Sequence, residues 1–353
     1  MLAPGATIGI LGGGQLGRML GIAAAQLGYR TQVLAPDEES VAAQTASAFI
    51  RADYHSRIVL DDFAAACDVV TYEFENIALD PIEYLAGKVP VHPCPRALAI
   101  AQDRAAEKSF VAELGGRTAP WHRVESPEDL RAAAAAIAGP AILKTRQLGY
   151  DGKGQSRLSG PDEADAAWAA IGARPAILEG RVAFTHEFSI LLARTVDGAM
   201  VSYPPPHNEH RDGILARSTV PAPAEVATQW TEAAALAGRI ADALDYVGVL
   251  ACEFFVGADG PVFNEMAPRV HNSGHWTIEG AVTSQFENHI RAICGLPLGD
   301  TGITARRVVM DNLIGEEAKD WLSALGQPDA HLHLYGKSLR AGRKMGHVTR
   351  LER

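Results

Sequence analysis

The sequence predicts a protein of mixed α/β and α+β class, with a doubly wound N-terminal domain followed by a second α/β region. In residues 7–95, short apolar runs alternate with helix-like stretches, and strands separated by helices imply crossovers in a mostly parallel sheet. In residues 248–266, two β-rich runs flank Asp259 and Gly260, a pair typical of an antiparallel hairpin. The 353 residues suffice for two or three domains.

The expected elements of the first domain alternate regularly. Its strands are expected at 8–11, 32–34, 49–52 and 69–72, and its helices at 15–27, 61–67 and 81–86. Prolines at 90, 93 and 95 interrupt this pattern, so the domain is expected to end near residue 95.

The second region reads as further helices, strands and loops. Helices are expected at 96–118, at the alanine run 132–136 and at 224–244, and proline-rich loops at 204–206 and 221–223. Near the end, basic residues gather at Lys337, Arg340, Arg343 and Lys344. An ordinary solvated face would also explain this cluster.

Composition excludes several classes of protein. A net charge of −10 gives no long-range attraction for nucleic acid, and no apolar run is long enough to span a membrane. The first residues carry no basic leader, so a cytoplasmic location is expected. The four cysteines lie far apart, which argues against a disulfide framework or a zinc cluster.

A first glycine cluster, residues 12–17, follows a strand and opens a helix, and matches the G-x-G-x-x-G pattern. Glycines let backbone N–H groups approach an anion at a helix N-terminus, which predicts a phosphate site. Asp37 stands near the position expected for a ribose contact in a nicotinamide enzyme. An oxidoreductase and a purely turn-forming role therefore remain alternatives.

A second glycine-rich segment, residues 149–155, follows an apolar run that ends at Lys144. Mobile glycines around a lysine can fold over a polyphosphate that Lys144 also reaches. The Gly-Lys-Ser/Thr ending of the Walker loop is absent. A simple glycine hairpin is the alternative.

Two glutamates, Glu253 and Glu265, lie on the two runs of the predicted hairpin. Antiparallel neighbours bring such side chains to one face of a sheet, and paired carboxylates suit Mg²⁺. Two solvated edge residues are the alternative, but the apolar flanks favour a metal.

Four histidines allow other interpretations. His207 and His210 have a spacing that two zinc ligands on a helix would need, but the flanking prolines predict a loop and further ligands are lacking. His271 and His275 are equally consistent with hydrogen-bonded core residues. No nucleophile-elbow pattern is visible.

Several segments together resemble one family. They are Gly-Gly-Gly-Gln-Leu-Gly-Arg-Met at 12–19, Thr-Tyr-Glu-Phe-Glu-Asn-Ile at 71–77, 149–155, 207–215, Asn264 to Trp276 with its His-Asn-Ser-Gly-His-Trp ending, and Gly-Arg-Lys-Met-Gly-His at 342–347. Over nearly its whole length the chain resembles the ATP-grasp enzymes, specifically the 5-(carboxyamino)imidazole ribonucleotide synthases.

The resemblance implies three domains and an activity. A pre-ATP-grasp domain would span 1–95, an ATP-grasp domain 96–300 with a lid at about 119–178, and a small β-rich C-terminal domain 301–353. The enzyme would use ATP and one or two Mg²⁺ ions to carboxylate aminoimidazole ribonucleotide with bicarbonate, through carboxyphosphate. It would be a homodimer that binds neither nucleic acid nor membranes.

The resemblance also implies the site residues. The ATP-binding residues would be Arg104, Lys144, Gly149, Tyr150, Asp151, Gly152, Lys153, Gly154, Gln155, Glu179, Gly180, Arg181, Val182, Glu187, His210, Asn264 and Glu265. Residues in catalytic roles would be Tyr150, Lys153, Arg269, His271 and Lys344, with Arg269 holding bicarbonate. The ribonucleotide would meet Gly14, Gln15, Leu16, Glu73, Asn76, Asn272, Ser273, Arg340 and Lys344.

Glu253 and Glu265 would be the metal ligands. Many ATP-grasp enzymes have Asn two residues after the second glutamate, where this chain has Ala267, so Asn264 or water is expected to complete the shell. Three other activities remain open: an ATP-grasp ligase that uses formate or glycine, a nicotinamide oxidoreductase, and a nucleotide sensor without turnover.

Overall fold

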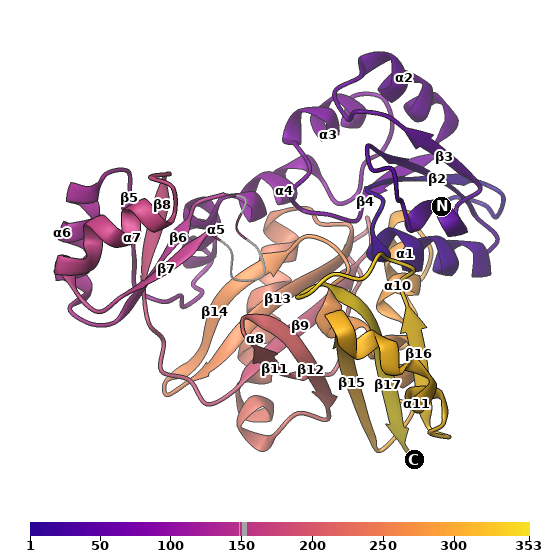
Figure 1. Cartoon of the computed structure of the whole chain (residues 1–353). Helices are drawn as coiled ribbons and strands as arrows, with labels where there is room; N and C mark the ends of the chain where they lie inside the picture. The colour runs from indigo at the N-terminus through magenta and orange to yellow at the C-terminus, as the bar shows by residue number, and fades with distance from the viewer. Residues whose placement is uncertain (148, 150–153) are drawn as a thin grey trace.

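The computed structural model describes residues 1–147, 149 and 154–353, and over these ranges the strands form three sheets (Figure 1). The N-terminal sheet has the order β3-β2-β1-β4 and is parallel throughout. Its elements, in chain order, are β1 (Thr7–Leu11), α1 (Gln15–Gln26), β2 (Arg30–Ala35), β3 (Ala48–Arg51), α2 (Arg57–Ala66), β4 (Val69–Tyr72) and α3 (Leu79–Ala86). The predicted doubly wound domain is confirmed.

One predicted helix of this domain is too short. The sequence predicts 61–67, whereas α2 already begins at Arg57. Leu60 and Phe63 both point into the core and are fully buried, while Ile58 is exposed. The exposed Ile58 obscures the amphipathic pattern of the first turn, so the helical spacing is recognisable only from Leu60 onward.

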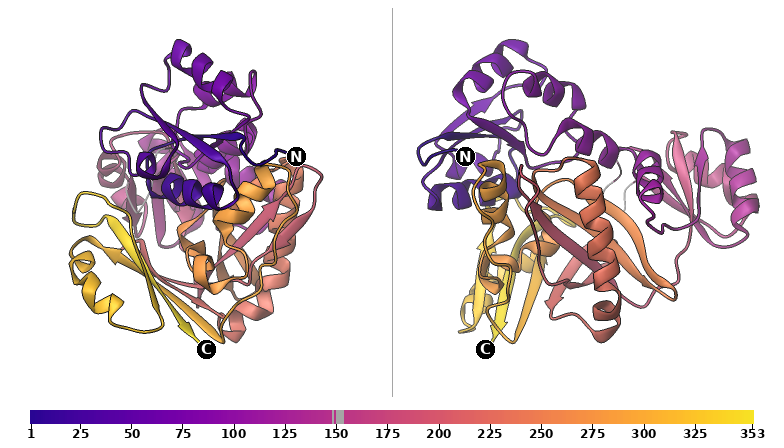
Figure 2. Two further views of the ribbon diagram at one scale, coloured as in Figure 1. Left: turned by 90° about the vertical axis from the view of Figure 1, so that its right-hand side faces the viewer. Right: turned by 180° about the vertical axis from the view of Figure 1, so that it is seen from behind.

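The lid sheet lies on the far side of the molecule from the N-terminal sheet (Figures 1 and 2). Its order is β5-β8-β6-β7, and all neighbouring pairs are antiparallel. The elements are β5 (Trp121–Val124), α6 (Pro127–Ile137), β6 (Ala141–Thr145), β7 (Gln155–Leu158), α7 (Ala164–Ala170) and β8 (Ala176–Gly180). A cluster that includes Leu130, Leu143 and Leu178 packs α6 and α7 against the sheet.

Two helices lead from the N-terminal domain to the lid, α4 (Pro95–Gln102) and α5 (Arg104–Glu113). Asp103 separates them, and its side chain accepts hydrogen bonds from the N–H groups of Ala105 and Ala106. This N-cap fixes the start of α5.

The central sheet has the order β14-β13-β9-β11-β12-β15-β17-β16, with β10 paired to β9. Its strands are β9 (Glu187–Arg194), β10 (Met200–Ser202), β11 (His207–Arg211), β12 (Ile214–Val220), β13 (Gly248–Gly257), β14 (Gly260–Ala267), β15 (Arg307–Ile314), β16 (Ala330–Leu334) and β17 (Lys344–Glu352). The predicted hairpin at 248–266 is confirmed as β13 and β14.

Helices cover the central sheet and join it to the N-terminal domain. These are α8 (Ala224–Ala243), α9 (Thr277–Gly280), α10 (Gln285–Ile293) and α11 (Trp321–Leu325). Phe286 and Ile290 of α10 share one core cluster with Leu16 of α1 and Val249 of β13. Burial of this shared apolar surface holds the N-terminal domain against the central sheet.

Two further features differ from a simple reading of the sequence. The expected loop at His207 and His210 is wrong, because both lie in β11, where Asn208 is buried and bonded to Ser189 and Ser218. The last strands, β15 to β17, continue the central sheet through pairing of β12 with β15. The domain boundaries at 95 and 300 stay predictions.

The four cysteines are free, and Cys67, Cys252 and Cys294 are buried. Among the residues that the structure describes, none of the helices combines the length and the apolar character needed to cross a bilayer.

Candidate active site

The two hairpin glutamates face each other across β13 and β14. Glu253 and Glu265 are register partners, and the register then shifts so that Phe254 pairs with Phe263. Asn264 is thus the extra residue of a β-bulge. A bulge re-aims side chains locally, and here it lets Asn264 line the same pocket as Glu253. We call Glu253, Glu265 and Asn264 the carboxylate cluster.

Burial and charge shift the two carboxyls of this cluster in opposite directions. Burial and then the neighbouring Glu265 raise the pKa of Glu253 to about 7. For Glu265, burial acts in the same direction, but Arg104 and Lys144 together outweigh it and lower the pKa. The Arg104 Nη1 atom lies 3.0 Å from Glu265 Oε2, and His271 Nε2 lies 3.6 Å from Glu253 Oε1.

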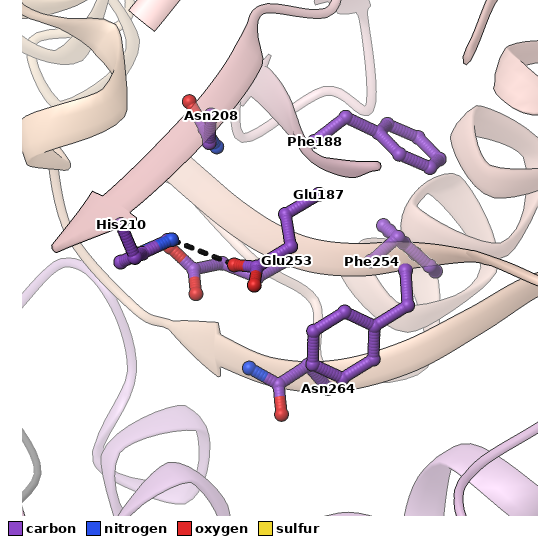
Figure 3. A pocket seen from close by; sticks show the side chains of 8 residues that line it. Glu187, Phe188, Asn208, His210, Glu253, Phe254 and Asn264 are labelled. Carbon is purple, nitrogen blue, oxygen red and sulfur yellow. Dashed lines mark ion pairs between the residues drawn. The ribbon is translucent and has the colours of Figure 1, made fainter. Parts of the chain in front are cut away.

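A pocket opens beside the cluster, lined by Glu187, Phe188, Asn208, His210, Glu253, Phe254, Phe255 and Asn264. Figure 3 shows Glu187, Glu253 and His210 directed toward one another. His210 Nδ1 lies 2.6 Å from Glu187 Oε2. Burial lowers the pKa of His210, but the hydrogen bond to Glu187 together with the charges of Glu253 and Glu187 outweighs it and raises the value.

The donor set fits Mg²⁺. Glu253 and Glu265 supply hard oxygens whose mutual repulsion a cation would relieve. In the described ranges, 1–147, 149 and 154–353, no group of three or more His, Cys, Asp or Glu side chains could hold a metal. Two carboxylates completed by phosphate oxygens and water are the usual arrangement for Mg²⁺.

Lys144, at the end of β6, reaches a buried carboxylate. Both Lys144 and Lys108 form ion pairs with Glu179 of β8. Burial raises the pKa of Glu179, but the two ammonium groups outweigh it and bring the value to about 2. Glu179 is therefore ionised at neutral pH. Gly180 ends β8, and the Arg181 N–H donates to Pro140 O at 2.9 Å, while Val182 is half-buried.

The second glycine segment lies only partly within the described residues. Tyr150, Asp151, Gly152 and Lys153 are outside them. The Gly149 carbonyl accepts from Arg104 Nη2 at 3.4 Å, and Gln155 is the register partner of Lys144. Gly154 has a φ of +69°, and a Cβ there would lie 2.7 Å from Thr145 Oγ1. Only glycine fits this turn.

The first glycine cluster does hold an anion, but the anion is Glu73. The Gly14 N–H donates to Glu73 Oε1 at 2.9 Å and the Gly17 N–H to Oε2 at 3.2 Å. Burial raises the pKa of Glu73. A Cβ on Gly14 would lie 2.7 Å from Glu73 Oε1. Leu16 packs in the core, so its side chain is not available to a ligand.

Arg269 and Glu75 form a bidentate pair behind the cluster. Arg269 Nη2 donates to Glu75 Oε1 at 2.7 Å, Nε donates to Oε2, and Nη1 donates to Val270 O at 3.0 Å. Burial raises the pKa of Glu75, but Arg269 outweighs it and lowers the value. The guanidinium expected to hold bicarbonate is thus held by Glu75. Asn76, next along the chain, is half-buried.

The His-Asn-Ser segment is bonded within the protein. Asn272 exchanges two amide hydrogen bonds with Asn312, at 3.0 and 2.6 Å, and His271 Nδ1 lies 2.9 Å from Ser273 Oγ. Burial and then Arg269 lower the pKa of His271 well below its usual value. His271 is therefore neutral at pH 7.

A basic cluster meets the first glycine segment. Lys337 donates to Gln15 Oε1, and burial together with Arg343, Lys344 and Arg340 lowers its pKa to about 8 despite Glu73. We call Lys337, Arg340, Arg343 and Lys344 the lysine cluster. Beside it lies a cavity lined by Glu38, Glu39, Ser40, Val41, Gln44, Gly336, Lys337 and Ser338. Sequence reasoning treated Lys337 only as part of a basic tail.

Comparisons with known proteins agree along the whole chain. Family models match as follows: the ribonucleotide synthetase preATP-grasp domain at 5–102, the ATP-grasp domain at 109–286, and the phosphoribosylaminoimidazole carboxylase C-terminal domain at 308–353. The N5-carboxyaminoimidazole ribonucleotide synthase of Brucella melitensis is 52% identical over 356 residues, which cover 99% of this chain and 98% of the relative. The chain belongs to the N5-carboxyaminoimidazole ribonucleotide synthase family.

Solved structures of this synthase family have the same fold. The enzyme from Thermus thermophilus aligns with a TM-score of 0.92 at 47% identity, over 98% of this chain and 93% of that one. A structure of the Aspergillus clavatus synthase in complex with ADP and 5-aminoimidazole ribonucleotide aligns with a TM-score of 0.90 at 30% identity, over 99% and 94%. The predicted family, fold class and ATP-grasp ligase assignment are confirmed.

Sequence reasoning missed two buried residues of α5. Glu107 Oε1 accepts from the Met266 N–H at 2.7 Å, and Lys108 pairs with Glu179. Burial raises the pKa of Glu107 to about 8, so the carboxyl is largely protonated at neutral pH. The available signal was their spacing: Glu107 and Lys108 follow the predicted Arg104 by three and four positions, and so share its face of α5.

Proposed function

We propose that this chain carboxylates 5-aminoimidazole ribonucleotide with bicarbonate, consuming ATP and releasing ADP and phosphate. One observation carries the proposal: Arg104 bonds both Glu265 of the hairpin and the Gly149 carbonyl of the glycine-rich segment. The lid strand of Lys144 and the carboxylate cluster therefore meet at one place. That convergence is what a nucleoside triphosphate bound with Mg²⁺ requires.

The reaction proceeds in two displacements. A bicarbonate oxygen attacks the γ-phosphorus of ATP, the bond to the β–γ bridging oxygen breaks, and ADP leaves with the electron pair. The amine nitrogen of the ribonucleotide then attacks the carbon of carboxyphosphate. The carbon–oxygen bond to phosphate breaks, and the amine proton leaves with phosphate. Activation is needed because bicarbonate is a poor electrophile.

Residues of the chain divide this work. Glu253 and Glu265 would hold Mg²⁺, which neutralises phosphate charge when bound. Lys144 would contact phosphate oxygens as a point charge, and the paired Glu187 and His210 would contact the nucleoside. If its hydrogen bonds to Glu75 were replaced by bonds to bicarbonate, the planar guanidinium of Arg269 would orient that anion. Neutral His271 sits between these groups and is available to move a proton.

The lysine cluster supports the ribonucleotide assignment. Lys337 contacts Gln15 at the start of α1, and the charges of Arg343, Lys344 and Arg340 lower its pKa, so this cluster would suit a phosphate monoester. Glu73, held on the Gly14 and Gly17 N–H groups, presents oxygen acceptors at the same place. The Aspergillus clavatus relative, crystallised with ADP and 5-aminoimidazole ribonucleotide, supports a carboxylation of the same ribonucleotide here. The homodimeric state and cytoplasmic location belong to the same proposal, and sedimentation velocity tests the first.

The test is ADP release by the purified chain. We expect turnover only when aminoimidazole ribonucleotide and bicarbonate are both present, with ¹³C from labelled bicarbonate appearing in a carbamate signal. Formate or glycine should not replace bicarbonate or the amine. ADP release with formate would instead favour another ATP-grasp ligase, and tight ATP binding without turnover would favour a nucleotide sensor.

A further inference from the structure

One turn of α5 contacts three consecutive residues of β14. Arg104 bonds the Glu265 carboxylate, Glu107 accepts from the Met266 N–H, and Lys108 donates to the Asn264 carbonyl at 3.4 Å. Residues i, i+3 and i+4 share one helix face, so this face follows the strand that bears the metal-ligand candidates. Figure 1 places α5 between the lid sheet and β14.

Lys108, like Arg104, also reaches the lid. Its ammonium pairs with Glu179 of β8 and bonds the carbonyl of Asn264. The residue is only 1% exposed, and Glu179 is 4% exposed. A buried ammonium is costly unless it is paired, so this position demands a reason beyond solubility or surface charge.

Glu179 lies between two ammonium groups of different exposure. Lys108 is 2% exposed at its side chain, whereas that of Lys144 is 18% exposed and opens to solvent. If Lys144 alone compensated the buried Glu179, the full attraction would hold its ammonium against β8. Because the Lys108 ammonium also neutralises Glu179, the net electrostatic attraction on the Lys144 ammonium is weaker. The more exposed Lys144 can then turn toward a phosphate.

We propose that Lys108 is a positioning residue for the nucleotide: by sharing the charge of Glu179 it leaves Lys144 available to a phosphate and ties lid strand β8 to β14. Lys108 itself touches no substrate. The inference rests on the proposed function only in taking ATP as the ligand.

The experiment measures binding of a non-hydrolysable ATP analogue with Mg²⁺ by titration calorimetry, without ribonucleotide or bicarbonate. Lys108→Met should weaken binding about 10- to 100-fold, and Lys108→Arg should recover to within about threefold of wild type. In Lys108→Met/Glu179→Gln the uncompensated carboxylate is gone, so binding should recover to within about threefold of wild type. In turnover, the KM for ATP should rise far more than the KM for ribonucleotide.

Lys88→Met is the matched control, because Lys88 pairs with Asp61 on the surface, and its binding should equal that of wild type. Wild-type binding by folded Lys108→Met would overturn the proposal. If Lys108→Met does not fold, the double variant decides: a loss of 10-fold or more there would show that Lys108 does not act through Glu179. Failure of carboxylation with intact analogue binding would count against the proposed function alone.

Discussion

The carboxylate cluster is built around acidic side chains, and the lysine cluster consists of basic ones. In the first, two acidic side chains face each other across a hairpin, and the pKa of Glu253 rises to about 7. In the second, four basic side chains gather near Gln15, and the pKa of Lys337 falls to about 8. The pKa shifts of Glu253 and Lys337 each reduce the excess charge around that side chain.

This difference separates sites built for ligands from sites built for stability. Glu179 and Glu75 are just as buried in the interior of the site, yet basic partners lower the pKa of both. A protein that needed only a stable fold would pair every carboxylate in this way. The carboxylate cluster is compensated only in part, because Arg104 pairs with Glu265 while the pKa of Glu253 stays raised. In the lysine cluster the pKa of Lys337 stays lowered. A bound cation would balance Glu253, and a bound anion would balance Lys337.

The largest expected effect is loss of the carboxylate cluster. Glu265→Ala should lower Mg²⁺-dependent ADP formation at least ~100-fold, because the metal loses one of two protein ligands. The melting temperature should stay within ~3 °C, since repulsion with Glu253 is relieved. Glu316→Ala, at an exposed glutamate paired with Lys319, is the control in the same assay. Retained activity in Glu265→Ala would show that the carboxylate cluster does not hold the metal.

Lys344→Ala tests the role of the lysine cluster. Removing one cation from the lysine cluster should raise the KM for aminoimidazole ribonucleotide about 10- to 100-fold and leave the KM for ATP within about threefold. Initial-rate measurements with each substrate varied in turn separate the two. Lys319→Ala, which removes an exposed lysine, should change neither. An equal rise in both KM values would show that the clusters do not serve different ligands.

A pH series sharpens the metal assignment. Below pH 7, Glu253 takes up a proton that must leave before a cation binds, so Mg²⁺ affinity should fall about tenfold per pH unit below 7 and level off above it. Calorimetric titration of Mg²⁺ at pH 6 and pH 8 measures the slope. Glu253→Gln should bind weakly at both values and lose most of the slope.

The smallest effect concerns Glu107, which lies behind the carboxylate cluster. Its pKa is about 8 in the fold but near 4.5 when unfolded. Stability from the protonated carboxyl is therefore complete below pH 4.5 and is lost as the pH rises through about 8. Glu107→Gln keeps an acceptor for the Met266 N–H, so it should match wild type near pH 5 and exceed its free energy of unfolding by roughly 2 kcal/mol at pH 8. Urea denaturation at both pH values measures this.

Much of the fold followed from local patterns. Alternating runs predicted the parallel N-terminal sheet, and Asp259-Gly260 predicted the hairpin that brings Glu253 opposite Glu265. The bulge at Asn264 was not predictable, because register is set by packing of Phe254 on Phe263. β11 was missed for a related reason: its polar residues face buried partners such as Ser189, which no local window contains.

The site residues that sequence reasoning missed depend on contacts far apart in the chain. Lys108 meets Glu179 across 71 positions of sequence, and Glu107 meets the Met266 N–H across 159. Two neighbouring charged residues on a helix are predicted to be exposed to solvent unless their interaction partners are known. The phosphate site at the glycine cluster stays a prediction, and the pattern could not reveal that the Glu73 carboxyl accepts hydrogen bonds from the Gly14 and Gly17 N–H groups.

The strand order of the central sheet has a consequence for biosynthesis of the protein. β17, formed by Lys344–Glu352, lies between β15 and β16 and pairs with both. β17 is synthesised after all the other strands of this sheet. The position between β15 and β16 therefore stays empty until residues 344–352 have left the ribosomal exit tunnel. Until β17 pairs, β15 and β16 expose unpaired edges, and a variant truncated before Lys344 should be recognised by chaperones and proteases as incompletely folded.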